Sequence, residues 1–207
     1  MDYVFISHFD TDHCNGLIEV MQNIPIYNLV IAKQAYISLE YKNIIEIANK
    51  KQISITACKT GDIVKIDNDN IMEILYVNKN STDLNNGSIV CKFAYKDFSM
   101  LFTGDIEKQT EAKIVELYKN TKKLKSNILK VAHHGSKTSS TQEFLNLVQP
   151  QIAVIGVGEN NTFGHPNIEV LERLKNIKAQ VYRTDKMGEI IFSINKKDKI
   201  SITKKLN

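Results

Sequence analysis

Long apolar runs, paired cysteines and a targeting signal are all missing from this 207-residue sequence. No apolar run approaches the roughly 18–20 residues that span a bilayer, and no basic segment leads into an apolar stretch with a small-residue cleavage site. The three cysteines, Cys14, Cys58 and Cys91, are odd in number and form no CxxC pair. These absences exclude a membrane channel and a disulfide-stapled mini-protein. Reduced thiols without an export signal predict a cytoplasmic chain.

Arginine is also scarce. Of the 27 basic residues, only Arg173 and Arg183 are arginines, and the others are lysines. The formal net charge of +4 permits a phosphate-bearing partner without requiring one. With 43% hydrophobic and 24% charged residues, the composition suits a folded domain with a substantial core and excludes a disordered tail. No internal repeat, low-complexity segment or linker divides the sequence, so we expect one domain over residues 1–207.

Strand-like runs alternate with helical patterns along the chain. The expected strands cover 2–7, 27–32, 53–56, 63–66, 71–77, 88–95, 99–104, 128–132, 151–157, 179–184, 189–194 and 199–203, with 88–95 and 99–104 forming a hairpin. The expected helices cover 16–23, 34–51, 107–119, 168–176 and a segment that begins near Thr141. Asn167 is expected to cap the 168–176 helix, and Ile114, Val115 and Leu117 to form the apolar side of the 107–119 helix. These units indicate an α/β or α+β fold in layers.

The five histidines are unevenly placed, and their positions point to the chemistry. They stand in short polar clusters, at His8 and His13, at His133 and His134, and at His165. Metal-competent polar residues recur where apolar strands are expected to end. In layered α/β folds such strand ends are where sites form, because a rigid strand fixes the loop that follows it.

The first cluster, His8-x-Asp10-x-Asp12-His13, places two imidazoles and two carboxylates within six residues. These groups would repel one another and be poorly solvated without a cation. Mixed nitrogen and oxygen ligands suit Zn²⁺ or Mn²⁺. The cluster therefore predicts a divalent-metal site, and a solvated acidic turn is the alternative.

Three further clusters follow other expected strands. Asp105 ends the strand before it in a Thr-Gly-Asp turn, and it is equally suited to be a ligand or the N-cap of the 107–119 helix. His133 and His134 precede a glycine that breaks their strand. Two exposed imidazoles on a loop are therefore favoured, rather than two buried histidine side chains. His165 lies in a Gly-His-Pro turn, for which a plain surface turn is the alternative.

Lysines gather before the second pair of histidines. Residues 108–137 hold eight lysines against two glutamates. Neutralisation of phosphates by lysines is the usual basis of nucleic-acid affinity. A solvated helix face in a lysine-rich protein explains the pattern equally well, and the same holds for the lysines of 196–205.

Four segments, ISHFDTDHCNGL, LFTGDIE, KVAHHGSKTSS and FGHPNIEVLERL, stand in the order found in the metallo-β-lactamase-like domain of ComEC-type competence proteins. The sequence resembles this family from residue 3 to about residue 174. The resemblance implies a four-layer αββα sandwich with one or two divalent ions, Zn²⁺ or Mn²⁺, at one edge. The implied ligands are His8 and Asp10 for one ion, Asp12 and His13 for the second, Asp105 as the bridge, and His134 or its neighbour His133 to complete the second site.

The sequence departs from this family in two respects. A separate histidine ligand precedes the bridging aspartate in the family, and the matching stretch here is Asn86-Gly87-Ser88, which offers a hydroxyl or an amide. Weaker ligation of the first ion predicts a centre that holds one ion at rest or accepts Mn²⁺ in place of Zn²⁺. Family members also have several strands before the first motif and a membrane channel domain. We therefore expect a sandwich without its usual N-terminal strands, from a truncated paralogue, a fragment or a chain completed by other means.

The resemblance favours a metal-dependent hydrolase that cleaves phosphodiesters, most of all DNA during uptake, beside a separately encoded membrane channel. Asp12 would orient or deprotonate the attacking water, and His133 or His165 would protonate the leaving group or bind a non-bridging oxygen. The expected substrate-binding residues are Ser88, Lys130, Ser136 and Lys137. In such an assembly the location would be a membrane or an extracellular face. The competing hypotheses are hydrolysis of another ester, thioester or lactam, and a non-catalytic metal- or DNA-binding remnant.

Overall fold

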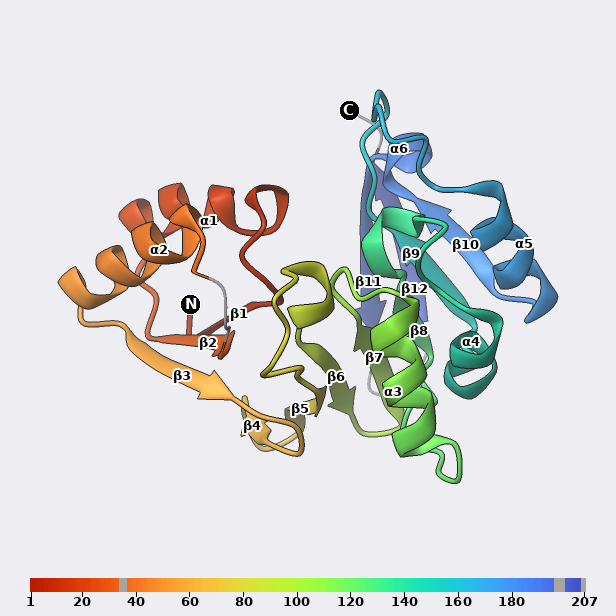
Figure 1. The fold of residues 1–207 in the computed structure, drawn as a ribbon, viewed down its shortest axis with the longest axis horizontal. Helices are drawn as coiled ribbons and strands as arrows, with labels where there is room; N and C mark the ends of the chain where they lie inside the picture. The colour runs from red at the N-terminus through yellow and green to blue at the C-terminus, as the bar shows by residue number, and fades with distance from the viewer. Residues whose placement is uncertain (34–36, 196–199, 206–207) are drawn as a thin grey trace.

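The computed structural model describes residues 1–33, 37–195 and 200–205. Its first sheet is parallel and has the strand order β1-β2-β3. The elements of this part are β1 (Tyr3–Ile6), α1 (Thr11–Asn23), β2 (Asn28–Ala32), α2 (Leu39–Lys50) and β3 (Ser54–Cys58). Helices α1 and α2 cover the outer face of the sheet (Figure 1). Met21 and Ile44 from these helices are buried against Leu29 and Ile31 of β2.

The second sheet has seven strands in the order β10-β9-β8-β7-β6-β5-β4, antiparallel from β4 to β7 and parallel from β7 to β10. Its strands are β4 (Ile63–Lys65), β5 (Asn70–Tyr76), β6 (Val90–Tyr95), β7 (Phe98–Phe102), β8 (Ile128–Lys130), β9 (Ile152–Ile155) and β10 (Gln180–Arg183). The helices α3 (Lys108–Tyr118), α4 (Gln142–Val148) and α5 (Ile168–Asn176) lie on its outer face (Figure 1). Their side chains Ile114, Phe144 and Val170 pack in one buried cluster with Leu101 and Leu129 of the sheet.

The inner faces of the two sheets meet. Val30 and Ala32 of β2 share a buried cluster with Ile74 of β5 and Cys91 of β6. Burial of this apolar surface joins the sheets, and helices lie outside each of them. The layers therefore run helix, sheet, sheet, helix, and the predicted α/β sandwich is confirmed.

A hairpin covers the β8–β10 end of the inner face. It consists of β11 (Glu189–Ile194) and β12 (Ile200–Lys205) and follows the short helix α6 (Thr184–Met187). Phe192 packs edge-on against Tyr182 of β10, with ring centroids 6.1 Å apart, and both lie in a cluster with Ile128 and Ile152. The sequence predicted the two strands but not α6, and Lys199 of the expected 199–203 strand lies outside the described residues.

Helix starts follow capping side chains. The helix expected over 16–23 begins at Thr11, because Asp10 caps it. The helix expected over 34–51 begins at Leu39 with Ser38 as its N-cap, and residues 34–36 lie outside the described residues. Asn167 caps α5 as predicted, and Thr141 caps α4.

The apolar side of α3 and the cysteines were also predicted from the sequence. The prediction that Leu117 lies on the apolar side of α3 was wrong, because Leu117 is 52% exposed, whereas Ile114 is fully buried as predicted. The three cysteines are buried and free, as their number predicted. Within the described ranges, no helix combines the length and the apolar character that a bilayer crossing needs.

Candidate metal centre

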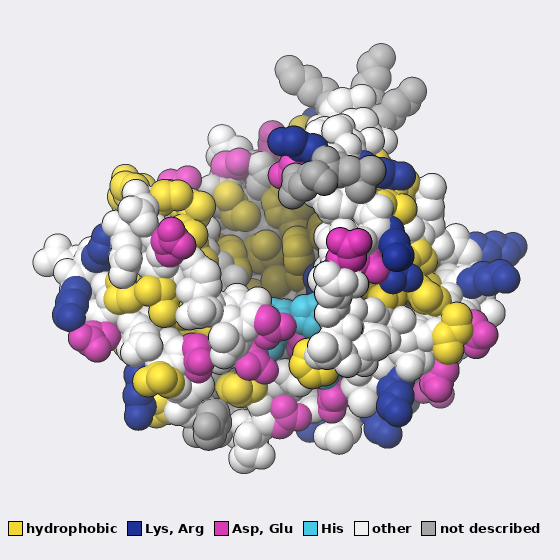
Figure 2. All heavy atoms as spheres, turned by 90° about the horizontal axis from the view of Figure 1, so that it is seen from above, with side chains coloured by type: hydrophobic (Ala, Val, Ile, Leu, Met, Phe, Trp, Pro, Cys, Tyr) yellow, Lys and Arg dark blue, Asp and Glu magenta, His cyan; other side chains and the backbone are white. Residues whose placement is uncertain are grey.

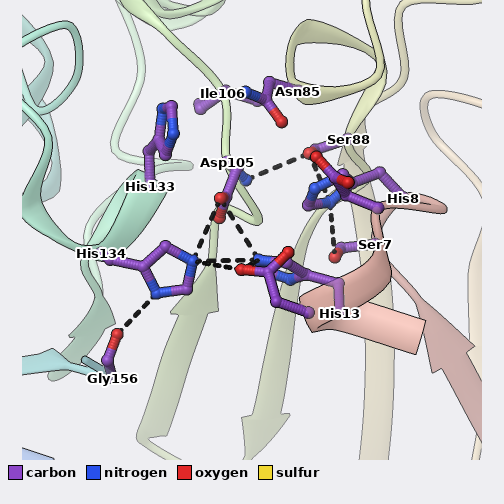
Figure 3. A network of polar contacts seen from close by, with 12 residues as sticks. Ser7, His8, His13, Asn85, Ser88, Asp105, Ile106, His133, His134 and Gly156 are labelled. Atoms are coloured by element: carbon purple, nitrogen blue, oxygen red, sulfur yellow. Dashed lines mark hydrogen bonds and ion pairs between the residues drawn. The ribbon is translucent and has the colours of Figure 1, made fainter. Parts of the chain in front are cut away.

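The first predicted segment runs from β1 into α1. Phe9 is fully buried and packs edge-on against an aromatic ring of α2, with the ring centroids 4.9 Å apart. The side chain of Asp10 accepts a hydrogen bond from the Thr11 N–H at 2.9 Å and so caps α1. With the loop anchored and the helix start fixed, the first turn of α1 directs His13 toward Asp105 and His134 of the second sheet (Figure 3).

The second segment is the turn after β7. Gly104 has a φ of +51°, and a Cβ at this position would lie 2.6 Å from the Cβ of Ser88. Only glycine fits there without displacing Ser88. The N–H of Asp105 then donates to Ser88 Oγ at 3.1 Å. The N-cap position of α3 is Glu107, so Asp105 is not the helix cap that the sequence also allowed.

The third segment follows β8, where His133 and His134 have φ angles of 48° and 52°. Nδ1 of His134 lies 2.6 Å from the carbonyl oxygen of Gly156. Because a carbonyl oxygen only accepts, Nδ1 carries the hydrogen and donates it. Metal-ligating histidines are usually held in this way, with the second nitrogen left for the ion.

One group of donor atoms comprises Asp12, His13 and His134. Nε2 of His134 lies 3.1 Å from Oδ2 of Asp12 and 3.2 Å from Nε2 of His13 (Figure 3). It lies 3.3 Å from Oδ2 of Asp105, and that oxygen lies 3.2 Å from Nε2 of His13. Bonds of about 2.0–2.1 Å in a tetrahedral site separate ligand atoms by roughly 3.3 Å. The spacing of these donors therefore fits a tetrahedral divalent ion.

A second group comprises His8, His13 and Asp105. His8 is 0% exposed, and its Nδ1 contacts Ser88 Oγ at 3.2 Å and Ser7 Oγ at 3.1 Å. Its Nε2 and the Oδ1 of Asp105 are buried, and neither has a hydrogen-bond partner among the described residues. Unpartnered buried polar atoms are costly, so their presence side by side fits a bound cation.

Protonation follows from burial and pairing. Burial, followed by the charge of His13, lowers the pKa of His8 to about 4. Burial opposes the charge of Asp105, but hydrogen bonds from His13 and His134 outweigh it and hold the pKa of Asp105 far below its usual range. The hydrogen bond to Asp105 raises the pKa of His134. A neutral His8 and an ionised Asp105 are in the protonation states that metal ligands need.

Asp10 lies outside both groups. It lines the same cleft as Asp12, but its carboxylate is engaged at the start of α1. Only Oδ1 accepts this hydrogen bond, so the ligand role that the resemblance implies for Asp10 would fall to Oδ2.

The groups open into a cleft of about 810 Å³ that His133 and His165 also line. The two rings lie 5.8 Å apart, centroid to centroid. Nδ1 of His133 lies 3.6 Å from a carboxylate oxygen of Glu107. Burial, followed by the charges of His133 and His134, lowers the pKa of His165. Both predicted proton donors thus face the space where a substrate would meet the metal groups.

None of the four predicted substrate-binding residues lines this cleft. Ser88 is 0% exposed and supports His8 and Asp105 from behind. Lys130 is half-buried, donates to the carbonyl of Val131 at 3.0 Å and shares a second cavity of about 280 Å³ with His13, within reach of the charges of Asp105 and Asp12. Ser136 is buried against Thr138, and Lys137 is exposed outside the cleft lining. Among the described residues that line the cleft, none is lysine or arginine.

The space-filling view agrees with this distribution. Figure 2 shows the histidines at the edge of a hollow, with acidic side chains grouped beside them and hydrophobic side chains on the floor. The eight lysines of residues 108–137 therefore give this cleft no basic lining, which favours the solvated-face interpretation of that segment.

Three residues near the cleft were not predicted from the sequence: Glu107, Asn161 and Phe163. Glu107 stands two residues after Asp105, and this spacing was the signal that could have placed its carboxylate near the site, where it lies 3.6 Å from His133. Asn161 and Phe163 stand in the loop before His165 and line the cleft. The lone aromatic in an otherwise polar loop was a signal in the sequence.

Comparison with known proteins agrees with the geometry. The family model described as metallo-beta-lactamase superfamily matches residues 1–159. This chain belongs to the metallo-β-lactamase superfamily. The fold of this superfamily binds divalent metal ions, and both donor groups described above lie within the matched residues. The superfamily membership supports a metal-dependent hydrolase.

Relatives of this superfamily member include competence proteins. It is 30% identical to ComE operon protein 3 of Bacillus subtilis (strain 168) over 190 residues, which cover 92% of this chain and 24% of that protein. It is 33% identical to competence protein ComA of Neisseria gonorrhoeae over 118 residues, which cover 57% of this chain and 17% of that protein. The chain thus spans about a quarter or less of the length of these relatives. The resemblance to ComEC-type proteins is confirmed.

A solved structure supports the fold alone. CmlA, a diiron β-hydroxylase from Streptomyces venezuelae, matches with a TM-score of 0.57 at 8% sequence identity. The match covers 88% of this chain and 43% of that chain. This likeness shows the metallo-β-lactamase-type arrangement of layers and carries no information about the reaction of this superfamily member.

Proposed function

We propose that this protein is a metal-dependent phosphodiesterase that acts on DNA in the context of competence, together with a membrane channel. The observation that carries the proposal is the contact of Asp105 with both His13 and His134 at the floor of an open cleft. The two donor groups share His13, and the Asp105 carboxylate of one group lies 3.3 Å from His134 of the other. Two adjacent cation sites suit in-line displacement at phosphorus, where attacking and leaving oxygens both need stabilisation. The names of the relatives support the competence context.

In this proposal the two groups hold ions of unequal affinity. Asp12, His13, His134 and Asp105 offer four donor atoms to one ion. His8 and the second oxygen of Asp105 remain for another ion, and Asp10, whose Oδ1 caps α1, lies outside both donor groups. We therefore propose one tightly held Zn²⁺ or Mn²⁺ and a second, weaker one.

Bound divalent ions supply Lewis-acid polarisation of phosphoryl oxygens and activation of water near neutral pH. The side chains of the chain supply the remaining steps. Asp12, with its side chain 62% exposed to the cleft, would orient the attacking water and accept its proton. His133, held beside Glu107, would donate a proton to the leaving oxygen, and His165 would bind a non-bridging oxygen.

The proposal is tested with purified protein, Mn²⁺ or Zn²⁺, single-stranded DNA and bis(p-nitrophenyl) phosphate. We expect turnover of both substrates that stops on chelation and in the His134→Ala variant. Because His134 is half-buried at the floor of the cleft, circular dichroism of the variant verifies that it is folded. Metal-loaded wild-type protein that cleaves neither substrate would refute the proposal.

A second candidate, hydrolysis of an uncharged ester, is favoured by one observation. Among the described residues that line the cleft, none is lysine or arginine, so no cationic side chain of the lining contacts a bound substrate directly. Turnover of p-nitrophenyl acetate, a thioester or a lactam by the metal-loaded protein, without turnover of phosphodiesters, would select this candidate.

A further inference from the structure

One aromatic side chain stands exposed at the rim of the cleft. Phe163 lies in the loop between β9 and α5 and lines the cleft with Asn161 and His165. It is 80% exposed, more than any other large hydrophobic side chain among the described residues. Single exposed hydrophobic residues are common, so exposure alone assigns no role. At the entrance of a candidate active site, however, the ring can contact a bound ligand that has an apolar face.

The loop that carries Phe163 is internally braced. The side chain of Asn161 accepts a hydrogen bond from the His165 N–H at 2.9 Å and donates to the His165 carbonyl at 2.8 Å. The N–H of Asn167 donates to the Gly135 carbonyl at 2.9 Å, which ties the loop to the turn after His134. These bonds hold Phe163 in a defined position relative to the metal groups, as a binding surface requires.

The ring of Phe163 begins a row of rings that leads to the candidate metal centre. It lies nearly parallel to His165, with an interplanar angle of 19° and centroids 5.9 Å apart. His165 lies 5.8 Å from His133, and His133 lies 6.3 Å from His134. The rim aromatic is thus three ring contacts from a donor of the metal group. A flat group bound at Phe163 would place an attached phosphate further into the cleft.

We infer that Phe163 is a stacking subsite for one nucleobase of a single-stranded nucleic acid. The inference rests on the proposed phosphodiesterase function and names the form of its substrate. Aromatic side chains bind single strands because each base offers a π-face, whereas bases inside a duplex have both faces covered by their neighbours. Among its described lining residues the cleft has no lysine or arginine, so side-chain cations add nothing along the strand beyond the metal groups, and stacking on Phe163 supplies an uncharged contribution to affinity.

The test compares binding of a fluorescent oligothymidylate by Phe163→Ala, Phe163→Trp and Ile168→Ala variants. Ile168 is the matched control, because it is 65% exposed, lies close in sequence and is absent from the cleft lining. Anisotropy is measured with chelator and with Mn²⁺ before any cleavage. A second oligonucleotide of the same length carries abasic sites, so that it keeps its phosphates and loses its stacking faces.

We expect Phe163→Ala to weaken binding of the oligothymidylate by about 5- to 150-fold, the range that loss of one stacked base gives. Phe163→Trp and Ile168→Ala should bind like the wild type, and the abasic strand should bind all four proteins equally weakly. Equal affinity of wild type and Phe163→Ala for the oligothymidylate would overturn the inference, as would an equal loss on both strands. Wild-type protein that cleaves bis(p-nitrophenyl) phosphate but binds no oligonucleotide would overturn the stacking subsite while keeping the phosphodiesterase proposal.

Discussion

Replacing Ser88 by alanine tests whether the buried hydroxyl behind the donor groups sets their affinity for metal. Ser88 Oγ accepts the Asp105 N–H at 3.1 Å and contacts His8 Nδ1 at 3.2 Å, and the residue is 0% exposed. No water from bulk solvent reaches this position to replace the lost hydroxyl. The Ser88→Ala variant leaves the donor atoms unchanged and removes only the group that orients them.

Two magnitudes follow from these contacts. The Asp105 N–H becomes a buried donor without a partner, which costs about 1–3 kcal/mol of unfolding free energy. For a chain of this size, 1 kcal/mol corresponds to roughly 2–4 °C in Tm, so Tm should fall by about 2–12 °C. Loss of a group that orients a metal ligand typically lowers metal affinity by about 10- to 100-fold.

Metal affinity is measured by calorimetric titration with Zn²⁺ or Mn²⁺, and Tm is measured separately in the presence of chelator. Ser126→Ala is the matched control, because Ser126 is 4% exposed and its hydroxyl donates to the Leu124 carbonyl at 3.0 Å. It lies in neither donor group. The control should lose stability and keep wild-type metal affinity. Wild-type metal affinity in Ser88→Ala itself would refute the reasoning that Ser88 orients ligands.

Three further predictions address the turn, the buried imidazole and the proton donor. Gly104→Ala forces a Cβ into a 2.6 Å contact at a φ of +51°, so thermal unfolding should show a loss of about 2–5 kcal/mol in unfolding free energy. Gly16→Ala is the control, because a Cβ there meets open space within α1 and should stabilise the protein by about 0.5–1 kcal/mol. Equal effects of the two substitutions would contradict the packing at Gly104. In chelator, the lowered pKa of His8 means that the unfolded state binds the proton first, so lowering the pH from 6.5 to 5 should cost about 2 kcal/mol of unfolding free energy by urea titration. His8→Gln should lack this component, and identical pH profiles would refute it. Glu107→Gln, which removes the carboxylate 3.6 Å from His133, should lower kcat on phosphodiesters by about 10-fold with KM unchanged, as expected for a transition-state role; a rise in KM alone would contradict it.

Local pattern predicted a layered α/β or α+β fold and a metal-competent cluster at residues 8–13, whereas the order of the four layers came from the family resemblance. The hairpin of β6 and β7, the Asn167 cap and the placement of polar clusters after strands all follow from spacing of a few residues. Family resemblance then placed Asp105, more than 90 residues along the chain from His13, in the same site, and its carboxylate lies 3.2 Å from that imidazole.

Other features depend on contacts that spacing does not encode. The Gly156 carbonyl that orients His134 comes from the loop after β9, and a backbone acceptor leaves no mark in the sequence. Ser88 was expected to bind substrate, but tertiary packing buries it behind His8. The lysines near the second histidine pair were also uninformative, since linear charge density does not show which helix face is solvated.

We propose that His8, Asp12, His13, Asp105 and His134 form a divalent-metal centre. Metal content and Tm of the wild-type protein, measured before and after chelation beside an Asp105→Asn variant, test this centre. We expect about one to two tightly bound equivalents of Zn²⁺ or Mn²⁺ in the wild type and a fall in Tm on chelation, with both effects lost in the variant. Less than about one bound equivalent, together with an unchanged Tm on chelation, would show that these residues hold no metal.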